Sequence, residues 1–465
     1  MNSRRRLMFG AGGAAALTAL NATTGSGAGM FGAMQRMAAA AGDAMVSNAH
    51  AQSADDYKAL VCLFMHGGND ANNMIVPLQA GQYGLYQQAR GRLALGTDVL
   101  LPVAPVNTGG ESFGFHPAMT QLQNLFSQGS AAVVANVGPL AEPTSKAQYD
   151  ARSVELPPNL MSHSDQQGLW QSGTSDGLAR TGWAGRVGDL MQSMNTNRGA
   201  TCLSLSGNNI WQNGTSLTSY KVSPSGNFGF NFYRENSNDP LSVSIGEILN
   251  SQRGHLFEAE WLKVISRALE NQRVMADAID SDQFEGAFPG SSLGRQLGMA
   301  ARLIAARNTL GMRRQTLFVS IGGFDTHGDD QLWRQESLLG QISEAVSAFY
   351  DATVTLGVAD KVTLFTASDF NRNLQSNGQG SDHAWGSHHL VVGGAVQGNS
   401  IVGQFPNLTL GGPDDARDSG IWIPTTSTEQ FAGTMATWFG VSPTEMATVM
   451  PTLDRFATPD LGFLG

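Results

Sequence analysis

Cysteine and charged residues are scarce in this 465-residue chain. Two cysteines cannot supply the clustered thiolates of an iron–sulfur site, and no haem-attachment motif is present, so a redox role is disfavoured. Charged residues make up 14% of the chain and the net charge is −10, which leaves no basic footprint for nucleic acid. After the N-terminal leader no run is apolar enough to span a bilayer, so we expect no stable membrane span in the mature chain. The 56 glycines are typical of a loop-rich α/β protein rather than a helical bundle.

The two cysteines, Cys62 and Cys202, both fall inside apolar, strand-like runs. An oxidising compartment would allow them to pair as a disulfide. Free cysteine is also among the most buried residue types and behaves as a small hydrophobic side chain. We favour two buried thiols.

The N-terminus has the pattern of a bacterial twin-arginine (Tat) export signal. The basic stretch Arg4 to Arg6 precedes a weakly apolar run, Phe9 to Leu20, whereas a membrane-spanning helix needs about 20 strongly apolar residues. The small residues around Ala51 offer a cleavage site, which disfavours an uncleaved anchor. We predict a signal peptide and leader over residues 1–51, export by the Tat translocase, and a periplasmic or secreted protein.

The mature chain alternates between strand-like and helix-like segments. Apolar runs without a polar face, typical of strands buried on both sides, lie at Tyr57–Met65, Ala131–Val137, Cys202–Leu205, Thr316–Ile321, Val362–Thr366 and Leu390–Val396. Stretches with helical periodicity lie at Pro117–Ser127, Phe257–Ile279, Ser292–Thr309, Leu332–Thr355 and Thr428–Phe439. This order predicts one large α/β domain over residues 52–465, with a doubly wound, mostly parallel sheet and helices on both faces. Residues 207–250, rich in Ser, Asn and Gly, form a possible insertion or lid.

Aspartates and histidines follow several of these runs. Asp70 follows the first run, Asp325 and His327 follow the run ending at Ile321, and Asp369 follows the run ending at Thr366. The carboxyl ends of parallel strands meet at one edge of a sheet, so we expect these side chains to converge there. Carboxylates hold hard divalent cations, and zinc also accepts imidazole nitrogen, so the pattern predicts a site for one or two metal ions.

The same site draws candidates from the segment before the last run. Asp382-His383 lies in a glycine-rich loop where a capping role is not evident. His388 and His389 point to opposite faces if the strand starts there, and either could be the ligand. Single residues also have purely structural interpretations. Asp70 could cap a helix or form an Asx turn, and His327 could be an ordinary loop histidine.

Seven motifs in the chain resemble those of a known family. They are Gly67-Gly68-Asn69-Asp70 with Asn73, His116-Pro117, Ser162-His163-Ser164-Asp165 leading to Trp170, Thr181-Gly182-Trp183-Ala184-Gly185-Arg186, Gly323-Phe324-Asp325-Thr326-His327, Ser368-Asp369-Phe370-Asn371-Arg372, and Gly380-Ser381-Asp382-His383-Ala384-Trp385-Gly386. In this order they resemble the DUF1501 family, Tat-exported bacterial proteins of the alkaline phosphatase and sulfatase superfamily.

The chain departs from that family at four positions. His66 stands where the family has Arg, and Phe324 where it has Trp. Asp369 replaces Glu, which keeps the carboxylate but shortens its reach by one methylene group. Asn371 replaces Gly, a milder change because Asn also tolerates positive φ.

The resemblance implies an alkaline phosphatase-like core that hydrolyses phosphate or sulfate esters, small or polymeric, with a divalent metal ion: zinc, calcium, magnesium or manganese. The predicted metal ligands are Asp70, Asp325, His327, Asp369, Asp382, His383 and His388, and the predicted catalytic residues are Ser162, His163, Ser164 and Arg372. The superfamily carries a Ser, Thr or formylglycine nucleophile at a helix N-terminus. Here Thr144-Ser145 and Ser162-His163-Ser164 are available, and neither cysteine is placed for formylglycine. Because no nucleophile stands out, a non-catalytic exported binding or assembly protein is the alternative.

Overall fold

The computed structural model describes residues 56–177, 179–226, 233–234, 237–251 and 254–465. The predicted signal peptide and leader lie outside these residues, as does part of the predicted insertion at 207–250. Residues Tyr57–Gly465 form one compact unit. In the described part of the chain, no helix is both long and apolar enough to cross a membrane.

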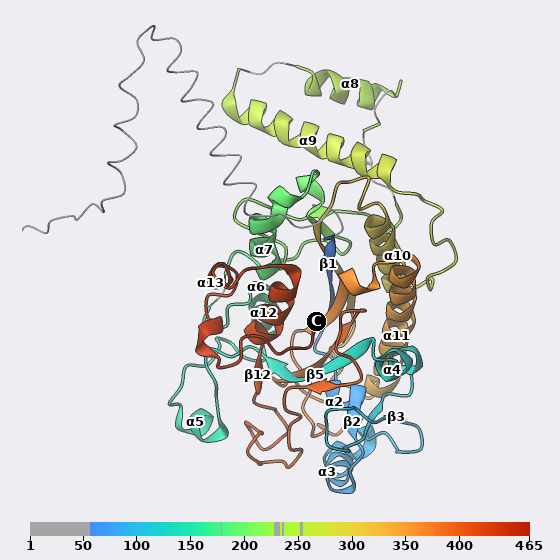
Figure 1. The fold of residues 1–465 in the computed structure, drawn as a ribbon. Helices are drawn as coiled ribbons and strands as arrows, with labels where there is room; N and C mark the ends of the chain where they lie inside the picture. The colour runs from blue at the N-terminus through green and yellow to red at the C-terminus, as the bar shows by residue number, and fades with distance from the viewer. Residues whose placement is uncertain (1–55, 178, 227–232, 235–236, 252–253) are drawn as a thin grey trace, which may run out of the picture. The chain divides into compact units, whose positions relative to one another are not determined.

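The core of the unit is a nine-stranded sheet (Figure 1). Its strands are β1 (Lys58–His66), β5 (Ala131–Gly138), β6 (Cys202–Ser204), β7 (Tyr220–Lys221), β8 (Arg314–Gly322), β9 (Val362–Ser368), β10 (Ser387–Val392), β11 (Ile401–Val402) and β12 (Thr426–Ser427). They lie in the order β11-β5-β10-β9-β1-β8-β6-β7, and β12 pairs with β5. Strand β1 pairs in parallel with β8 on one side and β9 on the other. Only β10 runs antiparallel to its neighbours, β5 and β9. The predicted doubly wound, mostly parallel sheet is therefore confirmed.

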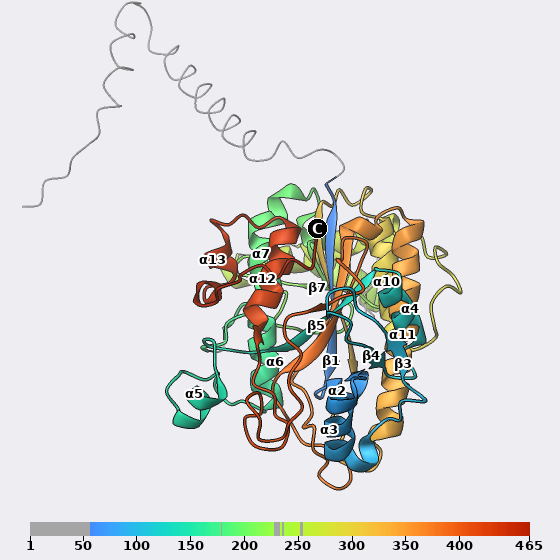
Figure 2. The same ribbon diagram turned by 60° about the horizontal axis from the view of Figure 1, so that its bottom comes forward.

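Helices cover both faces of this sheet (Figure 1, Figure 2). On one face lie α4 (Thr120–Ser127), α10 (Ser292–Ala305) and α11 (Gln331–Thr355), and on the other α6 (His163–Ser172), α7 (Trp183–Met191) and α12 (Thr428–Phe439). Strand β1 contributes to both cores, because Val61 and Leu63 pack with the first set while Cys62 and Phe64 pack with the second. Burial on both faces explains why this strand is a continuous apolar run in the sequence.

The remaining elements are short or peripheral. They are the antiparallel sheet of β2 (Ile75–Pro77), β4 (Phe113–Phe115) and β3 (Leu101–Val103), the helices α2 (Ala71–Met74), α3 (Ala80–Arg90), α5 (Lys146–Ala151), α8 (Pro240–Leu249), α9 (Leu256–Ala278) and α13 (Met446–Val449), and the 3₁₀ turns Gly91–Leu93, Gln192–Met194, Arg198–Ala200, Ala359–Lys361 and Leu453–Arg455. The described part of 207–250 contains β7, at the edge of the large sheet, and α8.

Local sequence explains individual boundaries. Helix α12 has the predicted bounds, and its N-terminus is fixed by a capping box in which Ser427 and Gln430 bond each other's backbone. Strand β10 begins at Ser387, earlier than predicted, so His388 and His389 both belong to it. Cys62 and Cys202 are buried and unpaired, which confirms the two predicted thiols.

Candidate functional site

The candidate site lies beyond the carboxyl ends of three adjacent strands. Strand β8 leads into Asp325 and His327, and β9 leads into Asp369 and Arg372. Between them, β1 ends at His66, the residue before a double-glycine turn. Parallel pairing brings these three strand ends to one edge, so residues far apart in sequence meet there.

The double-glycine turn after β1 lets these segments approach each other. Gly67 has φ of 111°, and a Cβ there would lie 2.4 Å from the backbone nitrogen of Asp325. Gly68 has φ of 81°, and its Cβ would lie 2.5 Å from the ring of Phe370. Side chains are disfavoured at both positions by backbone conformation and by space. The Gly67 nitrogen also donates to Oδ2 of Asp369, at 3.2 Å.

His163 is the first residue of α6 and reaches the site from the face of the sheet that α6, α7 and α12 cover. Its Nδ1 lies 2.6 Å from Oδ2 of Asp369, and its Nε2 makes no hydrogen bond and lies 3.5 Å from Oδ2 of Asp325. Gln167, one turn along α6, donates to the same oxygen of Asp369 at 2.9 Å. The carboxylate of Asp369 therefore holds the Nδ1 side of His163 and leaves Nε2 facing Asp325.

His383 approaches Asp325 from the loop before β10. Its Nδ1 lies 2.9 Å from the carbonyl oxygen of Met161, which can only accept, so Nδ1 carries a proton. Its Nε2 lies 3.3 Å from Oδ1 of Asp325. Burial lowers the pKa of His383, which favours the neutral ring with a lone pair on Nε2. The ring of Phe370 packs against both His163 and His383.

His327 lies between two carboxylates. Its Nδ1 is 3.0 Å from Oδ1 of Asp382, and its Nε2 is 3.0 Å from Oδ1 of Asp325 and 3.0 Å from Nε2 of His383. The hydrogen bond from Asn377 is the main cause that lowers the pKa of Asp382, so this carboxylate is ionised at neutral pH. With a side-chain exposure of 45%, His327 is the most open of the three histidines.

The charge of Asp325 is balanced by Arg372. Partial burial raises the pKa of Asp325, but the hydrogen bond and charge of Arg372 outweigh it and lower that pKa to about 2. The Nη2 atom of Arg372 lies 2.8 Å from Oδ1 of Asp325. Its side chain is fully buried, and its Nε makes no hydrogen bond. A buried guanidinium thus faces the half-exposed carboxylate at the floor of the site.

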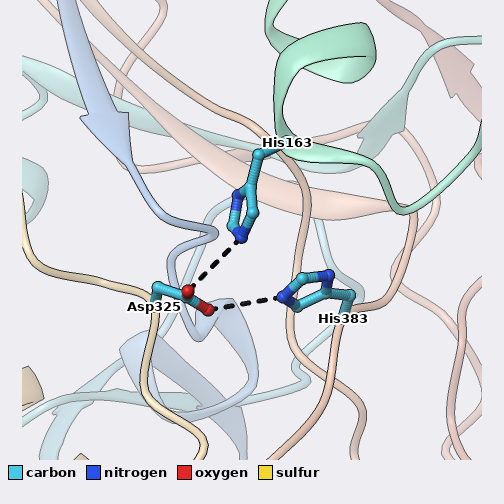
Figure 3. Close-up of side chains that lie close together, drawn as sticks. All are labelled: His163, Asp325 and His383. Carbon is cyan, nitrogen blue, oxygen red and sulfur yellow. Dashed lines mark hydrogen bonds and ion pairs between the residues drawn. The ribbon is translucent and has the colours of Figure 1, made fainter.

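Three of these residues satisfy the geometry of a metal site (Figure 3). One ligand atom from each of His163, Asp325 and His383 lies within 4.8 Å of the other two. Both imidazoles have Nδ1 occupied by an acceptor and turn Nε2 toward Asp325, as metal-bound histidines do when a carboxylate or carbonyl fixes their tautomer. The unpartnered Nε2 of His163 supports the same interpretation.

Asp70 does not join this group. It is fully buried and forms an ion pair with Arg90, and its Oδ2 also accepts from Gln331 at 2.6 Å. Because the turn at Gly67 and Gly68 follows β1 directly, the chain has changed direction before Asp70. Both partners hold its carboxylate in the interior.

His388 and His389 also lie away from the group. His388 accepts from the backbone of Asn136 through Nδ1 and stacks on Phe405. His389 points to the opposite face and packs on Trp170. Burial lowers the pKa of each to about 3, so both are neutral in the sheet.

The candidate nucleophiles are placed beside the group, at the start of α6. Ser162 precedes His163 and donates to Oδ2 of Asp165 at 2.5 Å, while Ser164 is exposed. In the part of the chain that the structure describes, no Ser, Thr, Tyr or Cys side chain forms a hydrogen bond with His163, Asp325, His327 or His383.

Three contributors carried no clear sequence signal. The carbonyl that orients His383 belongs to Met161, which has φ of 71°, a strained conformation for a long side chain. Gln167 could have been found from its spacing of four residues from His163 on one helix face. Asn371 is absent from the residues with positive φ, so it does not replace Gly in the way we expected. Its amide instead joins the backbones of Ala71, Arg372 and Gly386.

Comparison with known proteins gives a family but no activity. No curated protein matches the chain. Among solved structures, a Bacteroides thetaiotaomicron protein of glycosaminoglycan metabolism is 11% identical, with 86% of this chain and 74% of that chain covered and a TM-score of 0.32. A 2-O GAG sulfatase is 10% identical (85% and 75% covered, TM-score 0.30), and a substituted form of the alkaline phosphatase PafA is 11% identical (69% and 64% covered, TM-score 0.26). Likenesses this distant do not bear on activity. A family model described as "Protein of unknown function (DUF1501)" matches residues 57–448, which is most of the chain, and the protein therefore belongs to the DUF1501 family.

Proposed function

We propose that this protein is a metal-dependent hydrolase of phosphate or sulfate esters, with a divalent ion held by His163, Asp325 and His383. The observation that carries the proposal is the convergence of two imidazole Nε2 atoms on one carboxylate, each imidazole being held at Nδ1 by an acceptor. The Nε2 atom of His163 makes no hydrogen bond and lies 3.5 Å from Oδ2 of Asp325. A divalent ion between these atoms would give the imidazole nitrogen a partner.

The donor set favours zinc among the four candidate metals. Two imidazole nitrogens and one carboxylate oxygen match zinc, whereas calcium and magnesium prefer oxygen ligands throughout. Three protein ligands also match catalytic zinc sites, which keep a further position for water or substrate. When bound, the ion would supply Lewis-acid polarisation of the ester.

Arg372 supports an anionic ester as the substrate. Guanidinium groups recognise phosphate and sulfate oxygens through paired N–H donors. The guanidinium of Arg372 is buried beside the three ligands, and its Nε makes no hydrogen bond in this structure. We assign it to hold the Asp325 carboxylate and to place positive charge behind the site, favourable for an anionic substrate, rather than to transfer a proton, since arginine stays protonated.

His327 is our candidate for the proton-transfer group. Hydrolysis adds water across the P–O or S–O bond, so the leaving oxygen must gain a proton. The Asp382 carboxylate orients Nδ1 of His327, which leaves Nε2 directed at the site and within reach of solvent. Since Ser162 is engaged with Asp165, we propose water rather than a serine as the attacking group.

Metal analysis with two variants tests the assignment of ligands. Elemental analysis of protein purified without added metal should find about one zinc ion per chain in the wild type, as expected for a three-ligand site. His383→Ala should lose the metal, while His255→Ala, which changes the exposed histidine that precedes α9, should keep it. His327→Ala should keep the metal and lose turnover, which separates its role from that of a ligand.

Ester profiling tests the activity itself. Zinc-loaded protein should hydrolyse at least one aryl phosphate monoester, phosphate diester or sulfate ester, and Arg372→Lys should raise KM. Ser162→Ala should leave kcat within about threefold of wild type, because the proposed attacking group is water. Absence of turnover on all three ester classes by metal-loaded protein would defeat the hydrolase proposal.

A non-catalytic binding or assembly protein is the second candidate. It is favoured by the absence, among the described residues, of a hydroxyl or thiol group bonded to His163, Asp325, His327 or His383. The ion pair in which Arg372 already neutralises Asp325 also favours it. A protein crosslinked to this one in cells, whose binding survives Asp382→Asn with His383→Ala, would support this candidate if turnover is also absent.

Export is part of the proposal. We propose that the twin-arginine segment sends the protein through the Tat translocase, and that it works in the periplasm or outside the cell. The support is the sequence pattern of Arg4 to Arg6 followed by Phe9 to Leu20.

A further inference from the structure

Helix α9 leaves large apolar side chains uncovered. Phe257, Trp261 and Val264 are 78%, 56% and 59% exposed. They recur at spacings of four and three residues, so they lie on one face of the helix. A contiguous apolar face of this kind marks a contact surface more often than a solvated one.

The spacing continues along the whole helix as a heptad pattern. The positions are Phe257, Trp261, Val264, Ala268, Asn271, Met275 and Ala278, which we call the α9 seam. Its C-terminal part packs on the chain's own body, because Met275 is fully buried in the main core and the amide of Asn271 lies against Gly199. The N-terminal part of the same seam, from Phe257 to Ala268, has no such cover in the described residues.

Helix α8 does not cover the open part of the seam. It packs beside it, where Ile245, Ile248 and Leu249 share an apolar pocket with Ile265 and Leu269 of α9. Trp261 borders this pocket but is still more than half exposed. The two helices therefore form a hairpin (Figure 1), and the part of the α9 seam from Phe257 to Ala268 is left for a third helix.

We propose that the open part of the α9 seam binds the same segment of a second copy of this chain, antiparallel, across a two-fold axis. If the axis passes between residues 262 and 263, Phe257 meets the partner's Ala268, and Trp261 meets the partner's Val264. Each large side chain is then opposite a smaller one, as a packed core requires. A two-fold axis repeats each contact, so the two kinds of residue pair give four layers of packed side chains between the helices.

The charges that flank the seam favour this orientation. In the antiparallel pairing, Glu260 lies near the partner's Arg267, and Arg267 lies near the partner's Glu260, giving two attractive pairs. A parallel pairing would place Glu260 near the partner's Ile265 and Arg267 near the partner's Gln272, with no charge pair. Both residues are exposed on the helix, and Glu260 also pairs with Lys263 of its own helix, 2.6 Å away.

Charge reversal provides a sharp test by sedimentation or light scattering on the processed protein. Wild type should be a dimer that dissociates on dilution. Glu260→Arg and Arg267→Glu should each weaken the dimer by about tenfold or more, because each replaces two attractive pairs by two repulsive ones. Trp261→Glu should weaken it by about a hundredfold, since a buried aromatic is lost and a charge is buried.

Mixing the two charge variants decides the register. The Glu260→Arg chain and the Arg267→Glu chain complement each other, so their mixture should recover a one-to-one heterodimer, and the double variant E260R with R267E should recover the homodimer. Arg273→Glu makes the same charge change on the outer side of α9 and should leave association unchanged.

Two results would overturn the proposal. One is a wild-type protein that stays monomeric at every concentration tested. This includes the outcome in which the monomer binds vesicles of phosphatidylethanolamine and phosphatidylglycerol through Trp261. The other is a dimer that Glu260→Arg, Arg267→Glu and Trp261→Glu all leave intact, since its interface would then lie elsewhere.

Discussion

The Nδ1 atom of His163 lies 2.6 Å from Oδ2 of Asp369, and this contact links α6 to the end of β9. From this contact we propose that Asp369 orients His163 from behind rather than binding the metal itself. The shorter side chain at this position, relative to the family's Glu, is sufficient for that contact.

Asp369→Asn should weaken metal binding by about 10- to 100-fold, because an uncharged amide oxygen is a weaker acceptor than a carboxylate for Nδ1 of His163. Competition titration against a chromogenic chelator measures the change. Asp360→Asn alters an exposed carboxylate at the other end of β9 and should have no effect. Equal affinities for wild type and Asp369→Asn would show that Asp369 does not orient the ligand.

Gly67→Ala should destabilise the protein and disrupt the site, because the new Cβ would press on the backbone of Asp325 and the residue has positive φ. We expect a loss of at least about 1–3 kcal/mol in the free energy of unfolding, from the backbone conformation alone. Gly109→Ala is the matched control, since it also has positive φ but no atom near its Cβ. Denaturant unfolding and metal titration of both variants should show that only Gly67→Ala impairs metal binding.

Chelation should lower the melting temperature of the wild-type protein. An ion at a concentration of about 100 times its dissociation constant contributes about 2.7 kcal/mol to stability. Asp382→Asn combined with His383→Ala should remove the chelator response without unfolding the protein. Identical melting curves for wild type with and without chelator, on protein shown to have lost its metal, would contradict the metal site.

The pH dependence of the free energy of unfolding should show the contribution of Glu429, which is buried in α12. Burial raises the pKa of Glu429 above its ordinary value of 4.5, so the folded state keeps its proton to higher pH than the unfolded state. This group's contribution to stability is therefore complete below pH 4.5 and is lost as pH rises through the folded-state pKa. Glu429→Gln should gain stability relative to wild type between acidic and neutral pH. Glu445→Gln changes an exposed carboxylate, and the pH dependence of its stability should match that of the wild type.

Arg4→Lys with Arg5→Lys and Arg6→Lys should leave unprocessed precursor in the cytoplasm, because the translocon reads the paired arginines. Immunoblots of cell fractions measure the distribution. Normal recovery of the variant from the periplasm would exclude Tat export.

The sequence correctly predicted that Asp325 and His383 lie close together. This was possible because strand ends converge at one edge and because adjacent Asp and His have few other roles in a loop. Asp70 follows a strand too, but the turn at Gly67 redirects the chain, and only tertiary structure shows that Arg90 takes its carboxylate. Nothing in the sequence marks Met161, because its contribution is a backbone carbonyl.

The position of β1 also constrains how the chain folds. The first strand of the unit lies in the middle of the sheet, and both of its neighbours come from the later part of the chain. Gly67 and Asp369, which are bonded at the site, are 302 residues apart. Such long-range closure is slow, and the site is incomplete until nearly the whole chain has been synthesised. A nascent chain that ends before His383 therefore lacks part of the proposed site, and any metal loading must follow synthesis of that residue.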